Sequence, residues 1–312
     1  MKKILYVVHR YYPYPGGSEY YVKNMAEETL RRGHEVWVYT HMHKGDQNGI
    51  KVTSDINILL ESFDLIIVHG DSSAQNIVLT NITKIPSRVL YMIIKPTSNY
   101  STLKGLQDAK FISYSTEFDK KFINDLGFNK KLVYIPHGIP LDHLGVPGFK
   151  DKYGIKGKMI LSCGGFWKHK GHNELAELFS TLDTDFTLVM TGYWNDASYR
   201  PKDSLNIKTL ILEDMNEPLN AISEADLYIM NSYEEGFGLV LLEAMLNRTT
   251  WASRPVGKAP ELIEYGHLYE NTSQLKDIIL NKHKNINLEN SYNYIIKNHS
   301  IRLTVDNILN CI

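Results

Sequence analysis

The sequence predicts an α/β protein made of two doubly wound, Rossmann-like domains. The chain has 312 residues, about twice the length of an ordinary domain of roughly 150 residues. In each half, short apolar runs alternate with amphipathic segments, a pattern typical of a parallel sheet covered by helices on both faces. A stretch rich in Gly, Pro and charge, residues 137–158, separates the two series and is typical of a linker.

The first half is expected to form the N-terminal domain, residues 1–145. Its first helix starts at about Ser18, a good capping residue, and runs to about Arg32, because the apolar side chains between them fall on one helical face. Gly33 ends this helix. The strands expected in this domain are 4–8, 35–40, 64–69, 88–94, 110–115 and 131–136.

The second half is expected to form the C-terminal domain, residues 146–312, although its last helix can cross back to the first domain. The stretch from about residue 275 is polar and helical in pattern. Ligands of open parallel sheets bind at the carboxyl ends of the strands, so the loops after these strands are the places to look for a site. The expected strands are 159–165, 186–192, 207–212, 226–232 and 249–253.

The composition is that of a soluble globular protein, with 43% hydrophobic residues, 22% charged residues and a formal net charge of -1. The near-zero charge argues against a dedicated nucleic-acid binder. Cys163 and Cys311 have neither disulfide-framework nor zinc spacing. The apolar N-terminal run is too short for a signal peptide, and no run spans a bilayer. We expect a cytoplasmic protein, and association with a membrane surface stays an open alternative.

In each domain, a glycine-containing loop follows the first strand. Gly16 and Gly17 precede a helix N-terminus, where free N–H groups and close backbone approach suit a phosphate. The same residues also suit a plain strand-to-helix turn. In the second domain Lys168 and Lys170 lie in the loop after residue 165, and a lysine ammonium is a suitable partner for a diphosphate. Two loop lysines are also typical of a solvated surface.

The segment SYEEGFGLVLLEAM, residues 232–245, combines two glutamates with a glycine turn. Glu235 precedes the turn and is expected to project from the loop. Glu243 is expected about two turns into a helix that begins near Leu239. Carboxylates can accept hydrogen bonds from vicinal sugar hydroxyls, and the N–H groups of the turn can bind an anion. The alternative without a binding role is that Glu235 is an acidic residue at a helix N-terminus and Glu243 is a surface glutamate.

These segments, in this order, resemble the retaining glycosyltransferases of the GT4 group, which have the GT-B fold. EEGFGLVLLEAM resembles the family's E-x7-E segment, and PGGSEYYVKNMAEETLRRGHEV its N-terminal Gly-Gly loop and first helix. SYSTEFDKKFINDLGFNKKLVYIPHGI, LSCGGFWKHKGH and ASRPVGKAPELI are similar to three further family segments. The resemblance implies two Rossmann-like domains that face each other across a deep cleft and close around the donor.

The resemblance implies transfer of a sugar from a nucleoside-diphosphate sugar, UDP- or GDP-linked, to an acceptor hydroxyl with retention of configuration. No metal and no cofactor are expected, because fixed positive groups stabilise the leaving diphosphate. The candidate catalytic residues are Glu235, Lys170 and His69, the last chosen for its place at a strand end. The candidate donor-binding residues are Gly16, Gly17, Lys168, Asp214, Met215, Asn216, Gly236, Phe237, Gly238, Leu239 and Glu243.

Two positions depart from the family pattern. Gly165 stands where the family usually has an Arg five residues before the Lys-Gly pair, so Lys168, Lys95 or Arg254 must take its place. Lys95-Pro96-Thr97 stands where the family often has a His. A lysine ammonium cannot replace a neutral imidazole as a hydrogen-bonding group, and a lone histidine such as His69 is more often structural.

Two alternative functions stay open. A degenerate binding module would keep the fold and bind the nucleotide sugar without turnover, as Gly165 suggests. A DNA-base glycosyltransferase would share the architecture but would need a basic groove. The acceptor can equally be a saccharide, a lipid-linked saccharide, a protein or a small molecule. The aromatic residues of 10–15 and Tyr100 can stack on a sugar, while Lys120, Lys121, Lys130 and Lys131 hint at a membrane surface.

Overall fold

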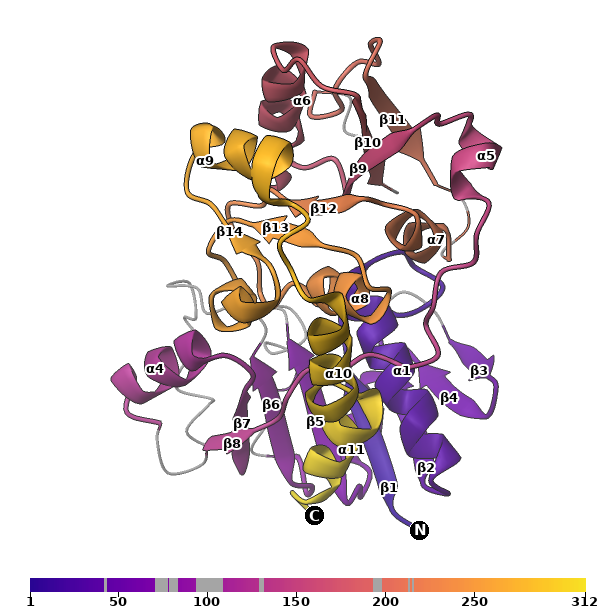
Figure 1. Ribbon diagram of the computed structural model, residues 1–312. Coiled ribbons are helices and arrows are strands. Elements are labelled where there is room, and N and C mark those ends of the chain that lie inside the picture. Colours follow the sequence, from indigo (N-terminus) through magenta and orange to yellow (C-terminus); the bar gives the residue numbers. More distant parts are fainter. Residues whose placement is uncertain are drawn as a thin grey trace. The chain divides into compact units, whose positions relative to one another are not determined.

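The computed structural model divides the chain into two compact units, which Figure 1 colours along the sequence. It describes residues 1–41, 44–70, 78, 84–93, 109–128, 132–192, 198–212, 214 and 216–312. Unit 1 contains Met1–Pro140 and His299–Ile312, and unit 2 contains Leu141–Asn298. The division therefore falls after Pro140, and the C-terminal segment belongs to the first unit. The predicted pair of Rossmann-like α/β domains is confirmed.

Unit 1 is built on a sheet whose described strands run in the order β3-β4-β2-β1-β5-β6-β7-β8. All neighbours are parallel except β3 and β4. Central strands β1 and β5 are almost completely buried, as expected where helices cover both faces. The strands are β1 Lys3–Val7, β2 Glu35–Tyr39, β3 Gly45–Gln47, β4 Ile50–Thr53, β5 Leu65–Gly70, β6 Val89–Ile93, β7 Phe111–Tyr114 and β8 Leu132–Tyr134.

The antiparallel hairpin β3–β4 is absent from our sequence predictions. Its two-residue turn is Asn48-Gly49, with φ of 54° and 86°. Both residues are in the left-handed region that a tight hairpin turn requires, and Asn-Gly is the pair that adopts it most readily. The dipeptide is a readable signal, but its flanking strands are too short to show the alternation of a half-buried strand.

The first helix of unit 1 begins earlier than predicted. Helix α1 spans Gly17–Arg31 with Gly16 at the N-cap position, so Ser18 lies inside the first turn and does not cap it. Gly33 ends the helix with φ 82°, as expected. The other helical segments of unit 1 whose bounds the structure describes are η1 Ile56–Leu60, α4 Glu117–Asp125 and α11 Ile301–Leu309.

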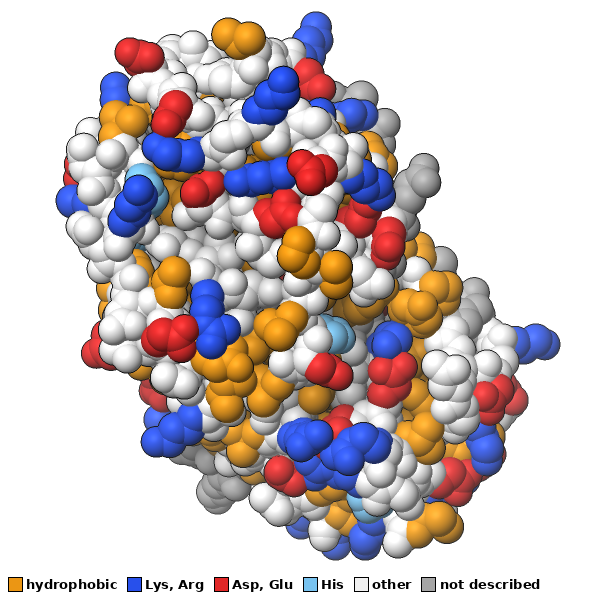
Figure 2. All heavy atoms as spheres, turned by 45° about the vertical axis from the view of Figure 1, so that its right-hand side comes forward, with side chains coloured by type: hydrophobic (Ala, Val, Ile, Leu, Met, Phe, Trp, Pro, Cys, Tyr) orange, Lys and Arg blue, Asp and Glu red, His pale blue; other side chains and the backbone are white. Residues whose placement is uncertain are grey.

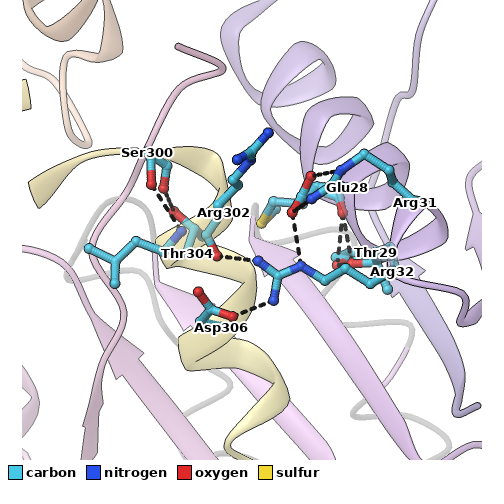
Figure 3. Close-up of polar contacts among 11 residues, drawn as sticks. Glu28, Thr29, Arg31, Arg32, Ser300, Arg302, Thr304 and Asp306 are labelled. Atoms are coloured by element: carbon cyan, nitrogen blue, oxygen red, sulfur yellow. Dashed lines mark hydrogen bonds and ion pairs between the residues drawn. The ribbon is translucent and has the colours of Figure 1, made fainter. Parts of the chain in front are cut away.

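The C-terminal segment completes unit 1 by packing beside α1 (Figure 1). Arg32 donates hydrogen bonds to Asp306 and to the carbonyl of Arg302, as Figure 3 shows. The Thr304 hydroxyl donates to the buried carbonyl of Pro136 at 2.7 Å. Ile139 and Ser300 form an isolated parallel bridge. These contacts hold residues 299–312 against helix α1 and against the segment 136–139.

Unit 2 contains a second sheet, in which the described strands are all parallel and run in the order β11-β10-β9-β12-β13-β14. The two-residue strand β14 is absent from our sequence predictions, because so short a strand has no periodicity to read. The strands are β9 Lys158–Cys163, β10 Phe186–Gly192, β11 Ile207–Ile211, β12 Leu227–Met230, β13 Trp251–Ser253 and β14 His267–Leu268.

Helices on both sides of this sheet enclose a core of buried aliphatic and aromatic side chains that includes Ile160, Leu188 and Ile229. No helix in the described ranges is long and apolar enough to cross a bilayer. The helical segments of unit 2 are α5 Phe149–Tyr153, η4 Lys168–Lys170, α6 His172–Ser180, α7 Glu217–Ser223, α8 Leu239–Leu246, η5 Ala259–Tyr265, α9 Thr272–Asp277, η6 Ile278–Lys282 and α10 Leu288–Asn298.

Candidate functional site

Lys170 and Glu235 form an ion pair at the carboxyl edge of the second sheet. The Lys170 Nζ atom lies 2.6 Å from Glu235 Oε1. Lys170 ends the η4 turn after β9, and Glu235 lies in the loop after β12, the neighbour of β9 in the sheet. The exposed fractions of the two side chains are only 21% and 15%. The structure thus brings together two of the three predicted catalytic residues, in a position reachable from solvent.

The glycine turn after Glu235 leads directly into α8. Gly238 is the N-cap of this helix and has φ 89°, a conformation that strongly favours glycine. Phe237 is buried, and its carbonyl accepts a hydrogen bond from the Lys258 N–H at 2.8 Å. Gly236 and Leu239 are partly exposed. The first N–H groups of a helix have no acceptor within it, so the start of α8 is suited to bind an anion.

Glu243 lies in the second turn of α8, closer to the helix start than predicted. Its side chain is partly exposed, and no hydrogen bond or ion pair joins its carboxylate to another described residue. Burial raises the pKa of this carboxyl to about 7. A carboxyl group in such surroundings gains from any hydrogen-bond donor that a ligand brings. Vicinal hydroxyls are donors of the right kind.

The remaining candidates of unit 2 lie on exposed turns. The Lys168 side chain is exposed and has no partner among the described residues. Asp214 and Asn216 form an exposed turn before α7, in which Asp214 accepts the Asn216 N–H at 2.9 Å. Met215 lies outside the described residues, as do Lys95, Tyr100, Lys130 and Lys131 of the sequence analysis.

The Gly16–Gly17 loop of unit 1 is covered by an acidic side chain. Glu19 is buried, and its carboxylate lies so close to Gly16 that a Cβ there would be 2.1 Å from Glu19 Oε2. Arg10 Nε pairs with the same carboxylate at 2.9 Å. A phosphate at this helix start would therefore meet Glu19 as well as the N–H groups. The interpretation of Gly16 and Gly17 as diphosphate ligands requires Glu19 to move.

His69 is the second-last residue of strand β5 in unit 1, where it is buried. Its ring lies 5.3 Å from the ring of Tyr21, which in turn lies 4.7 Å from the ring of His137. This burial among aromatic rings agrees with a structural histidine.

Two basic residues of unit 2, Arg254 and His172, do not offer a free positive charge in place of the missing arginine. Arg254 is bound to Glu174 at 2.6 Å, with two further hydrogen bonds to Asn231 and to the Glu270 carbonyl. Burial lowers the pKa of His172 to about 4, so its imidazole is neutral at physiological pH. Lys170 is therefore the partly buried cation of this loop. Sequence analysis missed Asn231, because a lone Asn at a strand end carries no recognisable signal.

No group of three or more His, Cys, Asp or Glu side chains in the described ranges is placed to hold a metal ion. Lys170, Glu235 and Glu243 can supply hydrogen bonds and charge to a ligand. One ammonium group, two carboxyl groups and a helix N-terminus lie in the segments that follow the neighbouring strands β9 and β12. Such a set can bind a ligand that carries both an anion and hydroxyl groups.

Residues 148–300 match the family model of glycosyl transferases group 1. The match covers nearly all of unit 2 and concerns the same family that the sequence motifs resemble. A curated relative from Campylobacter jejuni is 31% identical over 120 residues: N-acetylgalactosamine-N,N'-diacetylbacillosaminyl-diphospho-undecaprenol 4-alpha-N-acetylgalactosaminyltransferase. The match covers 37% of this chain and about a third, 33%, of the relative.

Solved structures share the fold over the whole chain. Anabaena HepE, solved in complex with UDP and glucose, superposes with a TM-score of 0.80 at 14% identity and 99% coverage of both chains. Sucrose-phosphate synthase from Thermosynechococcus elongatus gives a TM-score of 0.82 at 14% identity, covering 99% of this chain and 98% of that chain. At this identity the likeness concerns the fold, and it supports the GT-B fold class.

Proposed function

We propose that the chain is a glycosyltransferase that moves a hexose from a nucleoside-diphosphate sugar to an acceptor hydroxyl. The observation that carries the proposal is the Lys170–Glu235 pair, held at the carboxyl edge of a group 1 glycosyltransferase domain. Glu243 and the N-terminus of α8 also fit a nucleotide sugar, because such a ligand carries both hydroxyl groups and a diphosphate. We propose a UDP-linked donor first, because HepE was solved with UDP and glucose.

In this reaction the bond between the anomeric carbon and the diphosphate oxygen breaks, and a bond to the acceptor oxygen forms. The electron pair of the broken bond stays on the diphosphate, and the acceptor hydroxyl loses its proton. Lys170 and the N–H groups at Gly238 and Leu239 would stabilise the departing diphosphate. Glu235 would lie beside the donor sugar, and Glu243 would accept hydrogen bonds from the ribose hydroxyls. Retention of configuration is proposed from the family resemblance.

The acceptor that we propose is a saccharide, free or lipid-linked. The name of the C. jejuni relative specifies a diphospho-undecaprenol-linked saccharide as its acceptor. A DNA acceptor would need a continuous basic surface. On the face shown in Figure 2, Lys and Arg side chains are interspersed with Asp and Glu, in keeping with the net charge of -1.

A screen of UDP-, GDP-, ADP-, TDP- and CMP-linked sugars, by thermal shift and by slow hydrolysis without added metal, tests the proposal. We expect one class of donor to raise the melting temperature and to be hydrolysed. Lys170→Ala and Glu235→Ala should abolish hydrolysis while the protein stays folded. Stabilisation without any hydrolysis, even with saccharide acceptors present, would instead favour the non-catalytic binding module. No stabilisation by any nucleotide would refute both.

A further inference from the structure

Every second residue from 231 to 235, in the loop after β12, contacts a residue of the loop that carries Lys170. Asn231 Nδ2 donates to the Gly171 carbonyl at 2.8 Å. The Tyr233 N–H donates to the His169 carbonyl at 2.8 Å. Glu235 accepts from Lys170 itself. The carbonyls on both sides of Lys170 are therefore held by the segment that carries its ionic partner.

Asn231 is the most constrained of these residues. It is 2% exposed, and its amide uses all of its hydrogen-bonding capacity. The Nδ2 group donates to Gly171 and, at 3.0 Å, to Glu174 Oε2. The Oδ1 atom accepts from Arg254 Nε at 3.1 Å and from the Tyr269 hydroxyl at 2.7 Å. Only one orientation of the amide satisfies these four contacts, so the side chain is fixed.

The partners of Asn231 are themselves fixed. Arg254 pairs with Glu174 at 2.6 Å, and its guanidinium lies 4.6 Å from the centroid of the exposed Tyr233 ring. Burial alone would raise the pKa of Glu174, but hydrogen bonds from Arg254, Asn231 and Tyr233 hold it below its ordinary value. Glu174 is thus a carboxylate at neutral pH. The network joins the ends of β12 and β13 to the first turns of α6.

Gly171 is the residue through which this network acts on Lys170. It has φ 68°, and a Cβ there would lie 2.6 Å from both Asn231 Nδ2 and the Asn231 carbonyl oxygen. Its carbonyl accepts hydrogen bonds from Asn231 and, at 3.2 Å, from the Leu175 N–H. The second of these hydrogen bonds closes the first turn of helix α6. The peptide group between Gly171 and His172, one residue after Lys170, is therefore held by two hydrogen bonds. The long lysine side chain itself is held at its ammonium end by Glu235.

We propose that Asn231, braced by Arg254 and Glu174, is a positioning residue that fixes Lys170 for the diphosphate of the ligand. The ligand in this proposal rests on the proposed function, whereas the loop geometry does not. Arg254 acts here through Asn231 and does not bind the phosphate itself. The missing arginine at Gly165 is then offset by the fixed position of one lysine and not by a second cation at the ligand.

Hydrogen exchange of the full chain without ligand tests the positioning role. Asn231→Leu removes all four hydrogen bonds with little change in volume. We expect amide exchange in residues 168–175 to become about tenfold faster, the effect of about one lost hydrogen bond on local opening. Asn206→Leu is the matched control, since Asn206 donates a single bond to the Phe179 carbonyl in the same unit. Exchange in 168–175 equal to that of the control would overturn the proposal.

Calorimetric titration with inorganic pyrophosphate then tests the link to the ligand. We expect Asn231→Leu to weaken binding about tenfold, and to weaken it no further when Lys170 is already Met, because both changes act on one group. Additive losses would overturn the proposal and favour direct binding by Arg254. If wild-type protein binds neither pyrophosphate nor any nucleotide, the proposed function fails, while the exchange result still decides the positioning role. If Asn231→Leu does not fold, Arg254→Lys replaces it as the test variant in both the exchange and the titration experiments.

Discussion

The ammonium group of Lys170 lies 2.6 Å from the carboxylate of Glu235, although the two residues are 65 positions apart in the chain. Without a ligand each side chain neutralises the other. A diphosphate that binds Lys170 must therefore compete with Glu235 for the same ammonium group. The pair holds the lysine ready for the ligand, and it also lowers the net attraction for an anion.

Removing each charge of this pair should change nucleotide binding in opposite directions. We expect Lys170→Met to weaken UDP binding roughly a hundredfold, because a charge-assisted hydrogen bond is lost and Glu235 stays partly buried without a partner. Glu235→Gln should strengthen binding of UDP by about threefold, since it removes a negative charge near the phosphates, while it abolishes sugar transfer. Calorimetric titration and a hydrolysis assay measure the two effects.

Lys202→Met is the control for charge, because this exposed lysine of the same unit has no role in the site. It should change UDP affinity by less than about twofold. Weaker UDP binding by Glu235→Gln would contradict the competition between the carboxylate and the phosphates. Sugar transfer at the wild-type rate by either site variant would contradict the assignment of the pair.

The carboxyl group of Glu243 should make the stability of the protein depend on pH. Burial raises its pKa to about 7 in the folded chain, whereas an unfolded Glu titrates at about 4.3. The unfolded state thus releases this proton at lower pH. The contribution of Glu243 to the free energy of unfolding should therefore fall as pH rises from about 4 to about 7 and stay constant above.

Glu243→Gln should remove this dependence. Relative to wild type, the variant should gain at most about 3.7 kcal/mol of unfolding free energy at about pH 8 and little at about pH 4. The partial exposure of the side chain makes the upper figure a limit. Denaturant unfolding at a series of pH values measures the difference. A stability difference that does not vary with pH would show that Glu243 titrates normally.

The C-terminal segment should stabilise unit 1 mainly through its buried contacts. Thr304→Val removes the hydroxyl that donates to the buried Pro136 carbonyl at 2.7 Å, and an unsatisfied buried acceptor costs about 1–3 kcal/mol. Asp306→Asn weakens an exposed ion pair with Arg32 (Figure 3), for which we expect less than about 1 kcal/mol. Urea unfolding compares the two variants. A larger loss in Asp306→Asn than in Thr304→Val would reverse this ranking.

Much of the fold could be predicted because burial leaves a local record in the sequence. The apolar runs that form β1, β5 and β10 are continuous, as strands buried on both faces must be. The hairpin β3–β4 and the short β14 escaped prediction because neither is long enough to show a period. The predicted N-cap of α1 was wrong because both Ser18 and Gly16 are suitable N-cap residues, and the sequence does not distinguish between them.

The sequence by itself determined the order of strands and helices and the residue types at the sheet edge, since both depend on neighbours within a few positions. Only the tertiary structure decided the partners. Glu235 pairs with Lys170, and residues 299–312 return to the first unit. These contacts join residues that are distant in the chain. The Lys170–Glu235 pair forms because the parallel neighbours β9 and β12 bring their carboxyl ends to one edge of the sheet, whichever loops connect them. Residues 299–312 return because α11 packs beside α1.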